Sequence, residues 1–473
     1  MIRVIMTGHQ YEYPLCDVLR MFYGTASVST ESTNILEAPC EEDLTIRSIL
    51  NENGSVETIS DEDATLYFTS KSNDFQLPPN REVKRQLYAA LSRWTGRSFP
   101  WGSLTGIRPT GVARELKTPE EMSRRYFTRN DKARLAFETA ANEDTVLLST
   151  KENHVNVYIG IPFCPSRCSY CSFISQDATK HLKILPEYID ALLHEMELVL
   201  HSKDIIVDTV YMGGGTPTVF SESEFRRLCD GVFSFPAISG ANEITVEAGR
   251  PDTITESKLL ALREYGISRI CINPQTLCND TLERVGRRHT EKDFYAKYDL
   301  ARKMGFHSIN TDLIAGLPGE TQNDFETTLR KIISLQPENI TIHSLYKKRS
   351  ARLTQDSYFA LHAGETDTLD AMLGFAADLL ALNQYRPYYL YRQKDTMGGH
   401  ENVGYERNGT PCVYNVAMMS DQRSVLSFGA GGMSKRAFPA HRVERCSCIK
   451  DPLEYVRKVE EMAMKKIAFF EYN

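Results

Sequence analysis

Short apolar runs alternate with amphipathic stretches between about residue 152 and residue 347. Each run is rich in Val, Ile, Leu or Tyr, which is typical of parallel strands that are buried on both faces. The predicted strands are Val155–Ile161, Ile206–Met212, Glu243–Glu247, Arg269–Asn273, Ser308–Ile314 and Asn339–Ser344. Strands that alternate with helices predict a parallel sheet with right-handed crossovers, curved into an open or partial barrel. We expect ligands to bind at the carboxyl ends of these strands.

Helical periodicity fills the segments between the predicted strands. Leu185–His201 carries its apolar residues along one face, as an amphipathic helix does. The helix predicted at Ser221–Phe233 begins with Ser221 and Glu224 at the spacing of a capping box. Gly266 and Gly305 follow two further helical patterns, at positions where a left-handed C-cap favours glycine.

The flanking segments are less regular. Before residue 150 the pattern predicts a strand at Ile2–Met6 and helices at Leu15–Phe22, Pro78–Trp94 and Pro119–Asn142. The acidic stretches Glu37–Asp43 and Asn51–Asp63 are interpreted as loops or strand connections, and FPWGSLTGIRPT as a fixed loop. After residue 347 come a predicted helix at Glu365–Asn383, the aromatic segment RPYYLYRQK, the Gly-rich segment SFGAGGMSKR and a terminal amphipathic helix.

The predicted fold class is therefore α/β. It consists of an N-terminal α+β domain at residues 1–150, a partial barrel of six strand–helix units at residues 151–347, and a C-terminal extension at residues 348–473. We expect this extension to be mostly helical or mixed.

Composition narrows the class of protein. Of the 473 residues, 41% are hydrophobic and 25% are charged, which is ordinary globular usage. No apolar run approaches the ~18 residues of a membrane span, and the first residues do not resemble a secretory signal. The net charge of −7 argues against nucleic-acid binding through bulk charge. We expect a cytoplasmic protein with no nucleic-acid partner, whose 11 cysteines are thiols or metal ligands.

Three cysteines stand close together directly after the first strand of the predicted barrel. In YIGIPFCPSRCSYCSF, Cys164, Cys168 and Cys171 follow C-x3-C-x2-C spacing. A structural zinc site normally has four protein ligands, often in two pairs, and a ferredoxin cluster uses four cysteines. Three unrelated buried thiols are the remaining alternative. The spacing favours a 4Fe-4S cluster with one iron open to a small molecule that carries an amine, a carboxylate and a reducible sulfonium bond.

Further motifs follow the cysteines in a fixed order. YIGIPFC, MGGGTPT, Glu247, Gln275, GRRHT and DLIAGLPGET run from Tyr158 to about Glu320. With the cysteine triad, they resemble the radical S-adenosylmethionine (SAM) superfamily and, within it, the oxygen-independent coproporphyrinogen III oxidase (HemN-like) family. The N-terminal segment with LTGIRPT and the total length resemble the HemZ-type branch of that family.

The resemblance implies a 4Fe-4S cluster and SAM as cofactors and assigns residues to them. The cluster ligands would be Cys164, Cys168 and Cys171. Tyr170 would pack on the SAM adenine, and the loop with Gly214, Gly215 and Thr216 would position the methionyl amine. The other implied SAM contacts are Glu247, Gln275, Arg287 and Asp312, and the implied catalytic positions are Tyr158 and Glu247. Without the cysteine triad, each residue would have an ordinary interpretation. The tyrosines would fill the core, the glycine loop would be a tight turn, the carboxylates would be loop charges, and Arg287 would lie on the surface.

The resemblance also implies a reaction. Two propionates of coproporphyrinogen III would be oxidatively decarboxylated to vinyl groups, giving protoporphyrinogen IX in anaerobic haem biosynthesis, with flavodoxin or ferredoxin as electron donor. A C-terminal domain would cover the substrate. Arginine suits bidentate carboxylate binding, so the candidates for the propionates are Arg250, Arg288, Arg386 and Arg392.

One position departs from the oxidase pattern. Decarboxylases of the founding type have a further cysteine where this chain has Phe173, and the haem-chaperone relatives also lack it. A haem chaperone on the same scaffold, with His400 or Cys412 as axial ligand, is therefore an alternative. Another radical SAM reaction, such as methyl transfer to a tetrapyrrole, is a second alternative.

Overall fold

The computed structural model describes residues 1–471 except 31, 42, 63–64, 73–75, 152–153, 172–175, 182, 203–204, 346–365, 394–398 and 440–441. The chain forms two compact units. Unit 1 contains Met1–Ala140 and Leu390–Asn402, and the described residues of unit 2 lie in Ala141–Leu345, Arg349–Tyr389 and Val403–Asn473. The division of the chain at residues 150 and 347 stays a prediction.

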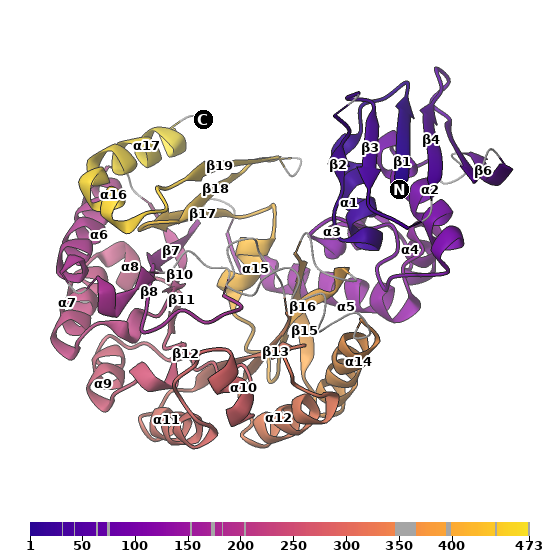
Figure 1. The fold of residues 1–473 in the computed structure, drawn as a ribbon. Coiled ribbons are helices and arrows are strands. Elements are labelled where there is room, and N and C mark those ends of the chain that lie inside the picture. The colour runs from indigo at the N-terminus through magenta and orange to yellow at the C-terminus, as the bar shows by residue number, and fades with distance from the viewer. Residues whose placement is uncertain are drawn as a thin grey trace. The chain divides into compact units, whose positions relative to one another are not determined.

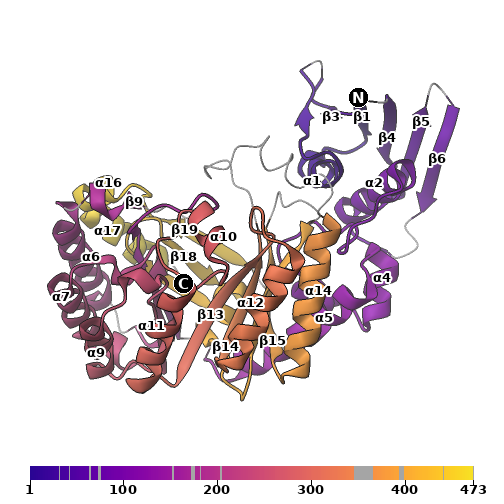
Figure 2. The ribbon, with the colours of Figure 1, turned by 60° about the horizontal axis from the view of Figure 1, so that its bottom comes forward.

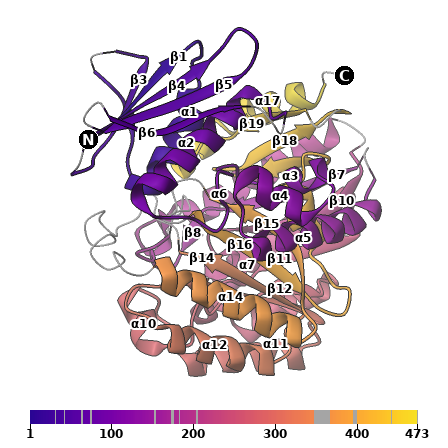
Figure 3. The ribbon, with the colours of Figure 1, turned by 90° about the vertical axis from the view of Figure 1, so that its right-hand side faces the viewer.

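Unit 1 is built on a mixed sheet with the strand order β2-β3-β1-β4-β5-β6. The strands are β1 (Ile2–Thr7), β2 (Ser27–Val28), β3 (Ile35–Ala38), β4 (Leu44–Leu50), β5 (Val56–Glu62) and β6 (Thr65–Ser72). Helices α1 (Glu12–Tyr23) and α2 (Pro79–Thr95) pack against this sheet (Figure 3). The core lies between them, because alternate residues of β1 meet the apolar faces of both helices.

Two predictions for this segment are wrong in part. The stretch Asn51–Asp63 contains strand β5, whose buried face is formed by Val56, Thr58 and Ser60. Two of these three residues are hydroxylic, so the strand shows no apolar alternation in the sequence. The helix predicted at Pro119–Asn142 is two helices, α4 (Pro119–Tyr126) and α5 (Asn130–Leu148), after the short α3 (Pro109–Glu115).

The break between α4 and α5 is caused by the Gly- and Pro-rich loop. Phe127 adopts a left-handed φ of 58° and ends α4. The amide of Ser103 donates to the Tyr126 carbonyl at 2.8 Å, and the amide of Arg129 donates to the Pro100 carbonyl at 2.8 Å. Residues 99–108 of FPWGSLTGIRPT are thus a fixed loop, as predicted, whereas Pro109 and Thr110 begin α3.

Unit 2 contains the predicted partial barrel. Its sheet has the order β15-β16-β14-β13-β12-β11-β10-β7-β17-β18-β19. The six central strands are parallel: β7 (Val155–Ile161), β10 (Val207–Gly214), β11 (Glu243–Glu247), β12 (Arg269–Cys271), β13 (Ser308–Ala315) and β14 (Asn339–Ser344). These confirm the six predicted strands with ends that differ by two residues or fewer, and they confirm the α/β class.

Helices cover the outside of this curved sheet (Figure 1, Figure 2). They are α6 (Ile184–His201), α7 (Glu222–Phe233), α8 (Pro236–Ser239), α9 (Glu256–Glu264), α10 (Asn279–Arg284), α11 (Glu291–Lys303) and α12 (Gln322–Ser334). The predicted capping box of α7 is present, with Ser221 and Glu224 bonded reciprocally. Gly266 and Gly305 have φ angles of 73° and 80°, as the left-handed cap requires.

The C-terminal extension is mixed and adds strands to both edges of the barrel sheet. Strand β16 (Glu401–Glu406) pairs antiparallel with β14, and β17 (Ser424–Phe428) pairs parallel with β7. The other elements are α14 (Thr366–Leu382), β15 (Arg386–Arg392), α15 (Val413–Met419), β18 (Met433–Ala437), β19 (Val443–Ser447), α16 (Pro452–Arg457) and α17 (Val459–Glu471). Among the helices described, none is long and apolar enough to cross a membrane.

A buried ion pair fastens the C-terminal helices to the barrel. Glu195 on α6 and Lys466 on α17 are 0% and 1% exposed, and their side chains form an ion pair. The same carboxylate accepts hydrogen bonds from the Tyr455 hydroxyl at 2.8 Å and from the Gly429 amide at 2.9 Å. One carboxylate therefore connects α6, α16, α17 and the turn after β17.

Replacing Glu195 with Ala should strongly destabilise unit 2, because the Lys466 ammonium would stay buried without a counter-charge. The expected loss in the free energy of unfolding is about 3–5 kcal/mol, measured by urea denaturation. Glu197, which is exposed on the same helix, provides the matched control, and Glu197→Ala should change stability by no more than about 0.5 kcal/mol. Equal losses in the two variants would contradict the importance of the pair.

Candidate functional site

The three cysteines lie on one short loop at the carboxyl end of β7. Strand β8 (Phe163–Cys164) pairs with β9 (Gln176–Asp177) and closes the two ends of this loop. Within it, the amide of Cys171 donates to the Cys168 carbonyl at 3.2 Å, and the amide of Ser169 donates to the Val285 carbonyl at 3.0 Å. The loop is therefore compact around the cysteines. Phe173, the position that departs from the oxidase pattern, lies outside the described residues.

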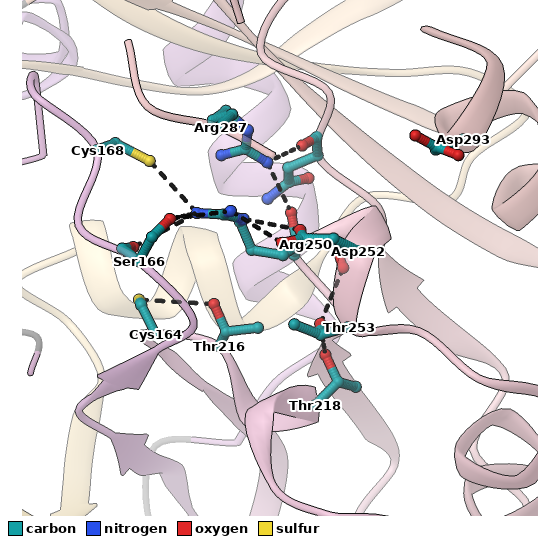
Figure 4. Close-up of polar contacts among 12 residues, drawn as sticks. Cys164, Ser166, Cys168, Thr216, Thr218, Arg250, Asp252, Thr253, Arg287 and Asp293 are labelled. Atoms are coloured by element: carbon teal, nitrogen blue, oxygen red, sulfur yellow. Dashed lines mark hydrogen bonds and ion pairs between the residues drawn. The ribbon is translucent and has the colours of Figure 1, made fainter. Parts of the chain in front are cut away.

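The surroundings of the sulfurs suit thiolate ligands. The Thr216 hydroxyl donates to Cys164 Sγ at 3.5 Å, and Arg250 Nη1 donates to Cys168 Sγ at 3.6 Å (Figure 4). Among the residues that the structure describes, no three His, Cys, Asp or Glu side chains close around a single metal ion. In a 4Fe-4S cluster each cysteine binds a different iron, and this loop carries three cysteines that can serve as such ligands.

The glycine-rich turn after β10 is bound to the segment that carries the cysteines. The amide of Gly215 donates to the Ile161 carbonyl and the amide of Thr216 to the Phe163 carbonyl, each at 2.7 Å. A Cβ atom at Gly215 would lie 2.4 Å from the Phe163 oxygen. Gly214 has a φ of 106°, and a Cβ atom there would lie 2.6 Å from the Tyr158 hydroxyl. This close backbone approach requires glycine at both positions.

Glu247 is held at the end of β11 beside this turn. Its carboxylate accepts hydrogen bonds from the Tyr211 hydroxyl at 2.5 Å and from the Gly214 amide at 3.2 Å. Burial is the main reason that the pKa of Glu247 rises to about 7, and the nearby Asp312 raises it further, while Tyr211 and Gly214 act in the opposite direction. The carboxyl group can therefore gain or lose a proton close to neutral pH.

A group of stacked tyrosines lies against Glu247. The ring centroids of Tyr211 and Tyr414 are 4.8 Å apart, and Tyr158 lies 6.4 Å from Tyr211 and 6.3 Å from Tyr414. Burial raises the pKa of all three, so their hydroxyls stay protonated. Tyr158 was a predicted site residue, whereas Tyr211 and Tyr414 were missed. Tyr211 could have been found from its place two residues before the GGG turn, but Tyr414 lies on α15 and has no local signal.

Asp312 on β13 is surrounded by hydrogen-bond donors. The side-chain amides of Asn273 and Asn310 donate to its two carboxylate oxygens at 2.8 and 2.7 Å. Burial, the largest influence, raises the pKa of Asp312, but His343, Asn310 and Thr341 together lower it below the ordinary value. Asp312 is therefore an anion at neutral pH, fixed in orientation at the carboxyl end of the barrel.

Gln275 adopts an unusual conformation beside Asp312. Its φ of 68° lies in the left-handed region, which is uncommon for a residue other than glycine. Its amide donates to the Asp312 carbonyl, and its carbonyl accepts from the Ile314 amide, both at 3.0 Å. The buried side-chain Oε1 has no hydrogen-bond partner within the described part of the chain. A strained residue with an unsatisfied oxygen is consistent with a ligand contact.

Arg287 is buried, although an adjacent pair of arginines is usually exposed. It is 7% exposed, whereas Arg288 is exposed. Its Nη1 donates to the Tyr170 hydroxyl at 3.2 Å, and its Nη2 donates to the carbonyls of Gly249 at 3.2 Å and Asn273 at 2.5 Å. Because the Asn273 side chain also donates to Asp312, one continuous network joins the cysteine loop to the far side of the barrel.

The other arginine candidates occupy different settings. Arg250 is 4% exposed and is bound to the cysteine loop and Asp252. Arg386 is exposed on β15. Arg392 belongs to unit 1, where its guanidinium lies 5.5 Å above the Trp101 ring and its Nε donates to the Gly399 carbonyl at 2.7 Å. Burial lowers the pKa of Arg392 to about 10. Of these, Arg288 and Arg386 are the ones accessible to a carboxylate in solution.

The two candidate haem ligands are both buried. His400 is 1% exposed and belongs to unit 1. The Cys412 thiol donates to Glu243 Oε1 at 3.5 Å, and burial raises its pKa to about 12. Neither side chain is open to a planar macrocycle.

Three comparisons place the chain among known proteins. Residues 158–332 match the family model of the radical SAM superfamily. The chain is 37% identical over 397 residues to the oxygen-independent coproporphyrinogen-III oxidase-like protein HemZ of Bacillus subtilis, covering 80% of this chain and 79% of that protein. It is 35% identical over 192 residues to the heme chaperone HemW of B. subtilis, covering 40% of this chain and 50% of that protein.

A solved structure shares the fold. Coproporphyrinogen III oxidase (HemN) from Escherichia coli, described as a radical SAM enzyme, matches with a TM-score of 0.51 and 21% identity. The match covers 69% of this chain and 73% of that one. It supports the partial barrel with additional elements.

Replacing Gly215 with Ala should displace the glycine-rich turn, because the new Cβ atom would meet the Phe163 and Ile161 carbonyls. We expect the affinity for SAM to fall at least tenfold, or about 1.4 kcal/mol, measured by anaerobic calorimetry. Gly374 on α14 has open space around its Cβ position, so Gly374→Ala serves as the control and should bind SAM normally. Equal affinities in both variants would show that the turn does not form the SAM site.

Proposed function

The chain belongs to the radical SAM superfamily, in the family of HemZ-like and HemN-like proteins, and we propose that it is an oxygen-independent coproporphyrinogen III oxidase. Its cofactors are a 4Fe-4S cluster and SAM. In the proposed reaction, a hydrogen atom is removed from the β-carbon of a propionate, CO2 leaves and one electron passes to an acceptor, which creates a vinyl group. Two such reactions convert coproporphyrinogen III to protoporphyrinogen IX.

The observation that carries the proposal is the direct connection between the cysteine loop and the GGGTP turn. Two backbone hydrogen bonds of 2.7 Å hold them together, so a cluster on the cysteines and a ligand on the turn would be neighbours. The substrate part of the proposal is supported by similarity to HemZ across 80% of the chain.

The residues present suggest how the cofactors would be held. Cys164, Cys168 and Cys171 would ligate three irons of the cluster. When bound, the cluster and SAM supply a carbon-centred radical that can abstract a hydrogen atom. The amine of SAM would lie near Thr216 and Glu247, and the other SAM contacts would be Tyr170, Gly214, Gly215, Gln275, Arg287 and Asp312.

The chain itself orients these groups and excludes water. Glu247 offers a carboxylate to a cationic amine, and the Tyr211 hydroxyl and the Gly214 amide fix its direction. The stacked rings of Tyr158, Tyr211 and Tyr414 form an apolar wall beside it. Such a wall would protect a reactive radical from solvent.

The proposed partners follow from the same chemistry. A reducing protein such as flavodoxin or ferredoxin would deliver the electron that starts each reaction, and we propose that this takes place in the cytoplasm. The substrate would be a tetrapyrrole whose propionates are negatively charged.

A haem chaperone is the second candidate function. It is favoured by the 35% identity to HemW over 192 residues and by Phe173 in place of a further cysteine. Such a protein would keep the cluster and SAM but would bind haem without forming a vinyl group. The burial of His400 and Cys412 makes them poor axial ligands in the described conformation.

Mass spectrometry of an anaerobic reaction with coproporphyrinogen III, SAM and a reductant tests the proposed function. We expect a product with two vinyl groups, together with CO2 and 5′-deoxyadenosine. Cys168→Ala should form none of these products, because a cluster ligand is lost, whereas Cys40→Ala in unit 1 should retain full activity. Stable haem binding with no vinyl product from the unaltered protein would instead support the chaperone.

Replacing Tyr211 with Phe should shift the pH dependence of SAM binding. The Tyr211 hydroxyl stabilises the ionised form of Glu247, so its removal should raise the pKa of Glu247 above about 7. SAM binding that requires the carboxylate should then be lost at a higher pH than in the unaltered protein. The measurement is the dissociation constant of SAM between pH 6 and about pH 9, a range chosen to span the Glu247 pKa.

The ionisable groups of SAM itself titrate in the same way with every variant, so they do not contribute to a difference between Tyr211→Phe and the unaltered protein. The control is Tyr265→Phe, because the Tyr265 hydroxyl donates to Asp230 on the surface. This variant should leave unchanged the pH at which SAM binding is half lost. If SAM binding by Tyr211→Phe were half lost at the same pH as in the unaltered protein, or at a lower pH, Tyr211 would not lower the pKa of Glu247.

A further inference from the structure

A buried guanidinium lies directly beside the predicted cluster ligands. Arg250 follows β11 and precedes the short helix η3 (Pro251–Thr253). Its Nη1 donates to Cys168 Sγ at 3.6 Å and to Ser166 Oγ at 3.2 Å, and its Nη2 also donates to Ser166 Oγ at 3.2 Å (Figure 4). One side of this cation is therefore bound to the cysteine loop.

The other side of Arg250 is held by a carboxylate. Arg250 Nε and Nη2 each donate to one oxygen of Asp252 at 3.0 Å, which is a bidentate pair (Figure 4). The Arg250 carbonyl also accepts from the Thr253 hydroxyl at 2.9 Å, and the hydroxyls of Thr253 and Thr218 lie 2.6 Å apart. The side of Arg250 that faces away from the cysteine loop is thus held in place, next to the one-turn helix η2 (Pro217–Val219) that follows the GGGTP turn.

This arrangement has an electrostatic consequence for a cluster on the cysteines. A charged N–H group that donates to a ligand sulfur stabilises the form of the cluster with more negative charge, which is the reduced form. Arg250 is 4% exposed, so water screens this effect only weakly. The Asp252 carboxylate opposes it, because it cancels much of the positive charge while leaving the N–H···S contact in place.

We propose that the Arg250–Asp252 pair sets the reduction potential of the cluster, with Arg250 raising the potential and Asp252 limiting the increase. Arg250 is then a positioning residue that acts through Cys168. The inference rests on the assignment of the cluster to the cysteine loop, and it is independent of which tetrapyrrole reaction the protein carries out.

The proposal predicts that substitutions of Arg250 and Asp252 shift the reduction potential in opposite directions. If the pair had only a structural role, the two substitutions would not have opposite effects. Arg250→Gln should lower the midpoint potential, and Asp252→Asn should raise it. The measurement is an anaerobic redox titration of the reconstituted full chain, followed by electron paramagnetic resonance of the reduced cluster. We expect each variant to change the ratio of reduced to oxidised cluster about tenfold at a fixed potential, which is ~59 mV for one electron.

An exposed pair of the same chemistry provides matched controls. Arg226 and Asp230 on α7 form an ion pair of 3.0 Å with both side chains about half exposed. Arg226→Gln and Asp230→Asn make the same changes of charge, but solvent screens them, so both should keep the potential of the unaltered protein. Arg250→Lys keeps the charge and should remain closer to the unaltered protein than Arg250→Gln.

The outcomes separate the proposal from the cluster assignment. Shifts of opposite sign at Arg250 and Asp252, with unchanged controls, support it. Shifts of the same sign, or no shift with full iron content, overturn it. If Arg250→Gln does not take up iron, Asp252→Asn decides alone, and an unshifted potential there overturns the proposal. If the unaltered chain shows no cluster signal, the cluster assignment fails first and the proposal fails with it.

Discussion

The close backbone approach between the end of β7 and the glycine turn after β10 is the constraint on which the site depends. Neighbouring parallel strands lie side by side, but their loops normally diverge after the last ladder bond. Here one amide of the turn donates to the carbonyl of Ile161, the last residue of β7, and the next amide continues the pairing beyond β7, to the carbonyl of Phe163. Cys164 directly follows Phe163, so the turn and the cysteine loop are fixed relative to each other before any ligand binds.

Buried charges define the rest of the site, and each is held by specific partners. Arg287 donates to backbone carbonyls and Tyr170, and Arg250 is paired with Asp252. Asp312 accepts from two asparagine amides. Burying a charge is costly without such partners, so these groups are positioned rigidly. Glu247 differs, because its pKa of about 7 leaves it balanced between two protonation states.

The sequence predicts the parts of the fold that are specified locally. The six parallel strands are short runs rich in Val, Ile, Leu or Tyr, and the cysteine triad and the GGG turn are short motifs, so both are visible without tertiary information. Strands β18 and β19 were missed because they carry charged residues, among them the half-buried Arg436 and the exposed Glu444 and Arg445. Arg250 contacts Cys168 although the two residues are 82 positions apart in the chain. Tyr414 likewise stacks on Tyr211, which lies in a distant segment. No local sequence pattern reveals either contact.

The order of strands in unit 2 also fixes when the protein can become complete during synthesis. Strand β7, which leads into the cysteines, gains its second neighbour only when β17 has been made, and Glu195 meets its cation only when Lys466 has left the ribosome. Until then β7 has one unpaired edge, and Glu195 lacks both its counter-ion and the C-terminal segments that bury it. The strand that leads into the cysteine loop therefore reaches its final surroundings only after the C-terminal elements have been added.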